Sequence, residues 1–314
     1  MGRESLIYKR NFSEISIRRK LAWNDIDLDN VRKIIELSLY EDLGKNNART
    51  PHDGDLSTKY SNIKGTGMVG LCSRQSMTVC GLELIPMISE LFSAQNLVPE
   101  IYYADSSKIS ADTIFASLKG NINDILLIER TVLNFIQHLS GIASYTSRLV
   151  SKTEKYGVGL LDTRKTTPGY RQLEKYATSC GGSFNHRIGL NERILVKDNH
   201  LASKNIQNVD QLRNFAKTLR TSSKDYFVQI EVDTIDQALS LTKEHTDAIL
   251  LDNFSINDLK KVLEARHPEV IIEVSGGITL DNIEEYAACK PDFISTGSPT
   301  HQSTWIDIGM DWLN

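Results

Sequence analysis

The sequence predicts an α/β protein with an N-terminal α+β domain of sandwich-like layers and a C-terminal partial, open α/β barrel. Three observations lead there: short apolar runs alternate with turn residues up to residue 118, one long helical stripe follows, and six apolar runs of strand length recur after Gly157. We expect the N-terminal domain to span residues 1–128 with the tail 302–314 joined to it, and the barrel domain to span residues 129–301.

The bulk composition indicates a globular protein without an obvious polymeric partner. The 314 residues are 40% hydrophobic and 24% charged, and the net charge of −4 gives no overall attraction to nucleic acid or to an anionic membrane. The basic start, residues 3–20, lacks the apolar stretch of a secretory signal, and no run reaches the roughly 18 residues that span a bilayer. We expect a cytoplasmic protein that binds neither nucleic acid nor membrane, and we assign no function to the basic arm. Four cysteines without a CxxC pair indicate neither a zinc site nor a disulfide framework.

The first predicted element is a surface helix over residues 24–43. Its apolar side chains recur at helical spacing, Asp27 or Asp29 can cap its first turn, and Gly44 ends it. The polar segment 45–58 that follows contains a proline and a glycine, so it is predicted to be a loop. Its aspartates suit turns better than a cation site.

Between residues 66 and 118, period-two alternation around a helical segment predicts antiparallel strands that carry a helix. From residue 124 to about 155 the apolar stripe of a long helix predicts the connection between the two domains. Glu129 and Arg130 are neighbours within it. They can form a solvated ion pair, or Arg130 can be a half-buried arginine directed at a ligand.

The barrel prediction rests on apolar runs of strand length separated by amphipathic helical segments, the rhythm of a parallel sheet covered on both faces. These runs are Val158 to Leu161, Ile194 to Val196, Tyr226 to Val232, Ala248 to Leu251, Val270 to Val274 and Asp292 to Ile294. The chain has no GxGxxG motif and no second half that reverses strand order, so a barrel is favoured over an open dinucleotide-binding sheet. Helix starts are predicted at Thr167 with Pro168, and at Thr234, Ser255 and Thr279.

Each apolar run ends in polar residues, and in parallel α/β barrels the carboxyl ends of the strands carry the active site. The polar groups are, run by run, Asp162, Arg164 and Lys165; Lys197, Asp198, Asn199 and His200; Glu231; Asp252 and Asn253; Ser275, Gly276 and Gly277; and Ser295, Thr296 and Gly297. With His186 and Arg187 from the segment between the first two runs, five potential cations surround this edge. Six coincidences of position predict a binding site there.

The residue types indicate an anionic ligand together with a divalent cation. Arginine and lysine suit carboxylates and phosphates, whereas Glu231 and Asp252 suit a magnesium ion that bridges a diphosphate. The glycines after the last two strands free backbone N–H groups for a phosphate. Taken singly, each has a structural alternative: a turn for the glycines, a cap or turn for Asp252, a backbone hydrogen bond for His186, and an orienting contact to Arg164 for Asp162.

Several motifs resemble one family, quinolinate phosphoribosyltransferase, over about Glu129 to His301. They are ERTVLNFIQHLSGIAS from Glu129, DTRKTTPGYRQLEKYA from Asp162, GGSFNHRIGL from Gly181, KDNH from Lys197, IEV from Ile230, LLDNF from Leu250, SGGIT from Ser275, and the STG that precedes Thr300 and His301. Weaker similarity extends back to the EDLG and GDLST segments. Phe184, Gln229 and Pro299, and an insertion of roughly ten residues before GDLST that includes residues 45–53, depart from the family's pattern.

This resemblance implies that quinolinate and 5-phosphoribosyl-1-diphosphate react, with magnesium, to nicotinate mononucleotide, diphosphate and carbon dioxide in NAD synthesis. It implies catalytic roles for Lys165, Lys197, Glu231 and Asp252, with the last two also binding Mg²⁺. It implies a homodimer or higher oligomer in which Arg130 acts in the neighbouring subunit's site. The substrate-binding set would be Arg130, Thr163, Arg164, Lys165, His186, Arg187, Lys197, Glu231, Asp252, Ser275, Gly276, Gly277, Ser295, Thr296 and Gly297.

Three other functions stay open at this point. A paralogue with the same scaffold could take another pyridine or base as its substrate. A Schiff-base lyase could use Lys165 or Lys197 as its nucleophile. A binding protein without turnover could hold the same anions.

Overall fold

A computed structural model describes residues 17–46 and 50–313. Most of the basic arm, residues 1–16, part of the insertion, residues 47–49, and residue 314 lie outside the described residues. None of the described helices is both long and apolar enough to cross a membrane. The described chain divides into two compact units. The N-terminal unit holds residues 21–147, 166–182 and 302–313, and the barrel unit holds residues 17–20, 148–165 and 183–301.

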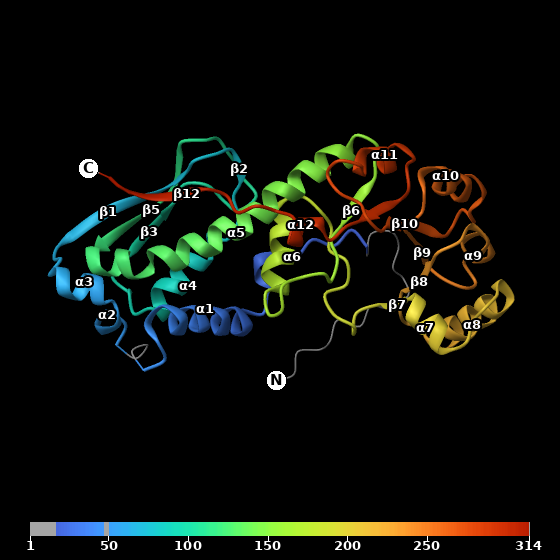
Figure 1. Ribbon diagram of the computed structural model, residues 1–314, viewed down its shortest axis with the longest axis horizontal. Helices are drawn as coiled ribbons and strands as arrows, with labels where there is room; N and C mark the ends of the chain where they lie inside the picture. The colour runs from blue at the N-terminus through green and yellow to red at the C-terminus, as the bar shows by residue number, and fades with distance from the viewer. Residues whose placement is uncertain (1–16, 47–49, 314) are drawn as a thin grey trace. The chain divides into compact units, whose positions relative to one another are not determined.

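An antiparallel four-stranded sheet organises the N-terminal unit (Figure 1). Its order is β12 (Ile308–Trp312), β1 (Thr66–Ser73), β5 (Thr113–Asn121) and β3 (Val98–Ile101), and the short strands β2 (Met77–Thr78) and β4 (Lys108–Ile109) form a separate pair. The antiparallel layer predicted for residues 66–118 is therefore confirmed. The tail adds its own strand, because Val69 to Ser73 pair with Trp312 to Ile308.

Helices of the N-terminal unit mostly follow the sequence pattern. After a short turn, η2 (Trp23–Asp25), come α1 (Leu28–Leu43), α2 (Pro51–Gly54), α3 (Leu56–Ser61), α4 (Leu84–Leu91), α5 (Ile122–Glu154) and α6 (Arg171–Cys180). The Asp27 carboxylate accepts the Asp29 N–H at the start of α1, and Gly44 ends the helix, both as predicted. The loop predicted for residues 45–58 is wrong in part. Asp55 caps α3 by accepting the Thr58 N–H, so an aspartate interpreted as a turn former starts a helix.

The long helix α5 runs from the N-terminal unit into the barrel unit, as predicted for a helix that connects domains. The compact units divide inside it, after Ser147, whereas the sequence analysis placed the boundary between residues 128 and 129. Most of α5 and all of α6 therefore belong to the N-terminal unit. One contact that holds α5 in this unit is the hydrogen bond from Gln137 Nε2 to the carbonyl of Ile308, at 2.9 Å.

Six parallel strands form the sheet of the barrel unit, in the order β6, β11, β10, β9, β8, β7. These are β6 (Gly159–Leu161), β7 (Ile194–Val196), β8 (Val228–Val232), β9 (Ala248–Asp252), β10 (Ile271–Ser275) and β11 (Phe293–Ser295). The first strand, β6, pairs with the last, β11, as it does in a closed barrel. Among the described residues, however, no ladder joins β6 to β7. A single bridge from Leu161 to Phe184 lies after β6. The prediction of a partial, open barrel is confirmed.

The helices that connect the barrel strands are α7 (Asp198–Ser203), α8 (Val209–Ser222), α9 (Ile235–Ser240), α10 (Ile256–Ala265), α11 (Ile283–Ala288) and α12 (Ser298–His301). Thr234 and Ser255 cap α9 and α10 with their side chains, as predicted. The predicted starts at Thr167 and Thr279 are wrong. In each case the residues after the threonine form turns, and the helix begins four residues later, at Arg171 and Ile283.

The last residues of the basic arm pack on the barrel unit. Ile17 is buried in a cluster with Leu161, Phe227, Ala248 and Phe293. The guanidinium of Arg18 lies 5.3 Å from the ring centroid of Phe184 and 5.2 Å from that of Phe293. The described end of the arm therefore covers apolar side chains of the barrel through an aliphatic side chain and cation–π contacts.

All four cysteines are free, and two of them meet in the N-terminal unit. Ligand atoms of Cys80, Asp105 and Cys180 lie within 4.8 Å of one another. The Asp105 carboxylate accepts the N–H groups of Gly81 and Leu82 and the hydroxyl of Tyr176. This cluster is a hydrogen-bonded network that ties the turn at residues 80–82 to α6.

Candidate active site

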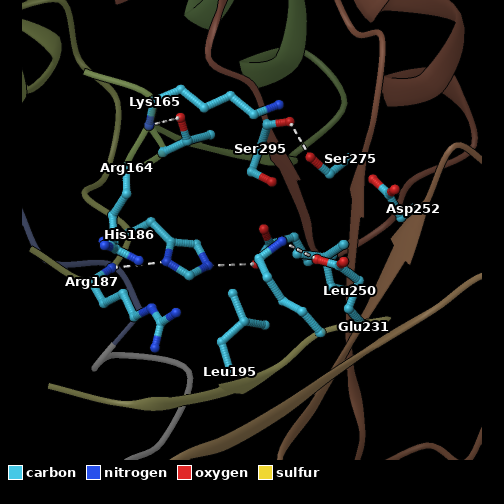
Figure 2. A pocket seen from close by; sticks show the side chains of 13 residues that line it. Arg164, Lys165, His186, Arg187, Leu195, Glu231, Leu250, Asp252, Ser275 and Ser295 are labelled. Carbon is cyan, nitrogen blue, oxygen red and sulfur yellow. Dashed lines mark hydrogen bonds and ion pairs between the residues drawn. The ribbon is translucent and has the colours of Figure 1, made fainter. Parts of the chain in front are cut away.

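A cavity of about 260 Å³ opens at the carboxyl ends of the barrel strands (Figure 2). Every strand of the parallel sheet, or the segment directly after it, contributes at least one side chain, as the sequence predicts. The lining residues are Thr163, Arg164, Lys165, His186, Arg187, Leu195, Lys197, Glu231, Leu250, Asp252, Glu273, Ser275 and Ser295. All of them belong to the barrel unit.

Asp162, directly after β6, holds the segment that carries His186. Its carboxylate is 2% exposed, and it accepts the Asn185 side-chain amide and the His186 backbone N–H, each at 2.8 Å. The sequence analysis left open that Asp162 is a buried orienting residue. The structure shows this kind of contact to residues 185 and 186.

His186 has a defined tautomer. The Arg187 backbone N–H donates to His186 Nδ1 at 2.9 Å, so Nδ1 carries a lone pair and the ring proton resides on Nε2 (Figure 2). A doubly protonated ring would lose this hydrogen bond. His186 thus presents its Nε2–H to the cavity as a hydrogen-bond donor, and its role as a fifth cation stays a prediction.

Two arginines supply positive charge beside this ring. The Nε atoms of Arg164 and Arg187 are buried and have no hydrogen-bond partner among the described residues. Burial, together with the nearby Arg164 and Arg193 guanidiniums, lowers the pKa of Arg187. Buried cations that repel one another require an anion for compensation.

Lysine and carboxylates meet on the opposite part of the rim. Lys197 Nζ lies 2.5 Å from Glu231 Oε2, and the Glu231 side chain is 7% exposed. Burial, and then the charges of Asp252 and Asp198, raise the pKa of Asp233 next to them. Glu231 and Asp252 are carboxylates on this part of the rim that could hold a Mg²⁺ ion, because oxygen ligands suit this hard ion.

The last two strands present small polar groups. Ser275 Oγ donates to the carbonyl of Ser295 at 3.2 Å, which joins the ends of β10 and β11. Gly276 has φ +93°, and a Cβ there would lie 2.6 Å from the backbone nitrogen of Asn253. Only glycine fits at this close approach between two strand ends.

Most predicted site residues come together in this cavity. Ten of them line it: Thr163, Arg164, Lys165, His186, Arg187, Lys197, Glu231, Asp252, Ser275 and Ser295. Gly276, Gly277 and Gly297 do not line it. Thr296 does not either, since its hydroxyl is buried and donates to the carbonyl of Ile278 at 2.6 Å.

Arg130 belongs to the N-terminal unit and is exposed on α5. The half-buried position that we weighed for it is therefore wrong. Its action in a neighbouring subunit stays a prediction.

Sequence reasoning missed three lining residues, Leu195, Leu250 and Glu273. The signal that could have found them is the two-residue period of a strand. Each lies two positions before a predicted site residue on the same strand or its end, so its side chain faces the same side of the sheet. Glu273 was missed because it stands inside an apolar run, where a carboxylate is unexpected.

Comparison with known protein families matches an N-terminal and a C-terminal domain of one enzyme. The family model described as quinolinate phosphoribosyl transferase, C-terminal domain, matches residues 142–311. The model described as the N-terminal domain of the same enzyme matches residues 55–140. Together the two matches cover the chain from α3 to β12.

Individual relatives align with this chain over most of their length. The chain is 31% identical to nicotinate-nucleotide pyrophosphorylase (carboxylating) of Mycobacterium leprae over 293 residues, 92% of this chain and 99% of the relative. It is 32% identical to the probable enzyme of that name from Synechocystis over 277 residues, 87% and 89% of the two chains. The solved structure of nicotinate-nucleotide pyrophosphorylase from Francisella tularensis superposes with a TM-score of 0.82 at 33% identity and covers 92% of this chain and 98% of that one. The chain therefore belongs to the quinolinate phosphoribosyltransferase family.

Proposed function

We infer that this chain transfers the phosphoribosyl group of 5-phosphoribosyl-1-diphosphate to quinolinate, with loss of carbon dioxide, to form nicotinate mononucleotide and diphosphate. The family supports this reaction. The observation that carries it is the division of one cavity rim into two parts. Arg164 and Arg187, whose buried Nε atoms have no acceptor among the described residues, lie beside His186. Carboxylates with a lysine lie around Glu231.

The arginine part suits the dicarboxylate. Arg164 and Arg187 are proposed to bind the two carboxylates of quinolinate, since a guanidinium fork matches a carboxylate in two hydrogen bonds. His186 adds a neutral donor, and Thr163 a hydroxyl. When quinolinate is fixed in this way, its pyridine nitrogen is held in line with the ribose carbon that it attacks, which carries the diphosphate.

The carboxylate part suits the phosphoribosyl donor with Mg²⁺. Glu231 and Asp252 are proposed to hold the ion, which would neutralise the departing diphosphate. Lys165 and Lys197 supply further positive charge there. Ser275 and Ser295, with Gly276, Gly277 and Gly297 at the same strand ends, are proposed to form the 5-phosphate site.

This arrangement accounts for both chemical steps without an enzyme nucleophile. When diphosphate leaves, positive charge develops on the ribose, and the cations around Lys197 stabilise the departing anion. The bond from the pyridine nitrogen to the ribose then leaves the ring positively charged. The carboxylate next to the ring nitrogen then departs as carbon dioxide, and the positive ring stabilises the electron pair that remains on the carbon. A proton finally bonds to this carbon in place of the carboxylate.

We further propose that the active unit is a homodimer or a higher oligomer in which Arg130 completes the neighbouring subunit's site. Its exposure on α5 is compatible with this role. The cytoplasmic location predicted from the sequence stays a prediction.

The direct test is an assay of the purified full chain with magnesium, quinolinate and 5-phosphoribosyl-1-diphosphate. We expect release of carbon dioxide, formation of nicotinate mononucleotide, and loss of both when EDTA removes the metal. Absence of both products would refute the proposal. Borohydride trapping of a covalent adduct on Lys165 or Lys197 would instead favour a Schiff-base lyase.

A further inference from the structure

Glu273 is a buried carboxyl group in a cavity otherwise rich in cations. It is 2% exposed and lies on β10, two residues before Ser275. Gln229 Nε2 on β8 donates to Glu273 Oε2 at 2.8 Å. The same oxygen lies 3.6 Å from His186 Nε2. Glu273 thus connects Gln229 on β8 with the ring of His186.

The imidazole of His186 is therefore contacted at both nitrogens. Nδ1 accepts the Arg187 N–H at 2.9 Å, which leaves the ring proton on Nε2, beside Glu273. At 3.6 Å the contact to Oε2 is electrostatic and weaker than a hydrogen bond. A substrate oxygen in the cavity can therefore compete for this proton.

Charged groups surround the ring of His186. Arg164 and Arg193 already oppose the charge of Arg187. A carboxyl group at Glu273 stabilises the N–H dipole of His186 that is directed toward it.

We propose that Glu273, held by Gln229, is a positioning residue for quinolinate binding: it orients His186 so that the ring offers its Nε2–H to a substrate carboxylate as a neutral donor. This inference rests on the proposed function. It assigns to Glu273 an effect on the affinity for quinolinate through His186, and no effect on the phosphoribosyl donor.

The first test separates the two substrates kinetically. Glu273→Leu keeps the approximate size but removes the group that orients His186. It should raise the KM for quinolinate about tenfold or more, because a misoriented ring loses its hydrogen bond to the charged substrate carboxylate. The KM for 5-phosphoribosyl-1-diphosphate should change less than about twofold. Glu273→Gln keeps an acceptor oxygen and should recover most of the affinity. The exposed Glu264→Gln on α10 is the matched control and should behave as wild type.

The second test asks whether Glu273 acts through His186. In a double-mutant cycle with His186→Asn, adding Glu273→Leu should change the KM for quinolinate by less than about twofold, because the ring it orients is gone. Nitrogen-15 NMR of histidine-labelled protein should show the Nε2–H tautomer for the signal that His186→Asn removes. Glu273→Leu should shift that signal, whereas Glu264→Gln should not.

Several results would overturn the proposal: an unchanged KM for quinolinate in folded Glu273→Leu, equal increases for both substrates, additive effects in the cycle, or an unshifted His186 signal. If Glu273→Leu does not fold, as judged by circular dichroism, Gln229→Leu removes the anchor instead, and the same four criteria apply. The NMR signature needs no turnover. A wild-type chain that leaves quinolinate unconsumed while Glu273 still controls the His186 signal would therefore contradict the proposed function and not the positioning.

Discussion

Asp162 shapes the arginine part of the cavity although its own carboxylate is buried. By accepting from Asn185 and from the His186 backbone, it fixes the segment after Phe184 and so the direction from which His186 and Arg187 enter. Charge alone would not produce a binding site here, because mutually repelling arginines have to be held in place by hydrogen bonds such as those to the Asp162 carboxylate. The substrate would then find its partners already in place, which lowers the cost of ordering them on binding.

At the same scale, Gly276→Ala should destabilise the barrel unit and raise the KM for 5-phosphoribosyl-1-diphosphate. An alanine at φ +93° is strained, and its Cβ would lie 2.6 Å from the Asn253 nitrogen, so we expect a loss of about 1–3 kcal/mol in the free energy of unfolding. Gly157→Ala is the matched control, because Gly157 has φ +75° and open space around it. Urea denaturation and steady-state kinetics measure both effects. Equal stability losses in the two variants would contradict the steric argument.

Among the elements, α6 illustrates how a helix with a polar sequence becomes buried. Glu174 is 0% exposed, its Oε1 lies 3.3 Å from His138 Nε2 on α5, and its Oε2 accepts the Thr167 N–H at 3.0 Å. The carboxylate therefore ties α6 both to α5 and to the turn that precedes it. Thr167 therefore contacts α6 through its backbone N–H, four residues before the helix begins at Arg171.

The buried carboxylate makes stability depend on pH. Burial raises the pKa of Glu174, but the hydrogen bonds from His138 and Thr167 outweigh it and bring the pKa below 4.5. A lowered pKa stabilises the fold above pH 4.5, and this contribution is lost as pH falls through the folded-state value. Glu174→Gln should therefore lower the free energy of unfolding by about 1–3 kcal/mol at pH 7.

The same difference should shrink as pH falls below about 4.5. Urea denaturation of wild type and variant at pH 7 and pH 4 measures it, with the exposed Glu83→Gln as the control that should show neither effect. A difference that does not change with pH would show that size or shape, and not charge, is responsible.

For the molecule as a whole, the proposal that Arg130 acts in a neighbouring subunit's site implies more than one chain. The cavity lies entirely in the barrel unit, while Arg130 lies in the other unit. If sites are shared between subunits, each chain contributes its barrel unit to one site and Arg130 of its N-terminal unit to another. Such sharing would also make activity depend on assembly, because a monomer would lack one of the cations that we propose for quinolinate.

Sharing can be tested by mixing two inactive variants. Arg130→Ala and Lys197→Ala should each lose most activity and keep their fold. Co-refolded in equal amounts, they should recover about a quarter of the wild-type activity, because half of the dimers are mixed and one of their two sites is intact. Mixing Arg130→Ala with Arg130→Met is the control and should recover nothing. Mixed dimers of the first pair that stay inactive would contradict sharing.

The repeats of the barrel, its strand ends and ten lining residues could be predicted from the sequence. Their signals are local: an apolar run ends where polar residues begin, and parallel strands bring those ends to one edge. Asp53 and Asp55 show the limit of such signals, since the same residue type serves turns and helix caps. The later starts of α6 and α11 show it again, because each threonine makes local hydrogen bonds in the turn that precedes the helix.

By itself, the sequence determined the fold class, the edge that carries the site and the family. Only the tertiary structure decided the gap between β6 and β7, the hydrogen bond that His186 accepts at Nδ1 and the place of Glu273 in the cavity. The physical reason is that these features depend on contacts between distant residues. Gln229 and Glu273 are 44 positions apart, and His186 contacts Glu273 from a third segment. No local sequence pattern predicts that these three side chains come together.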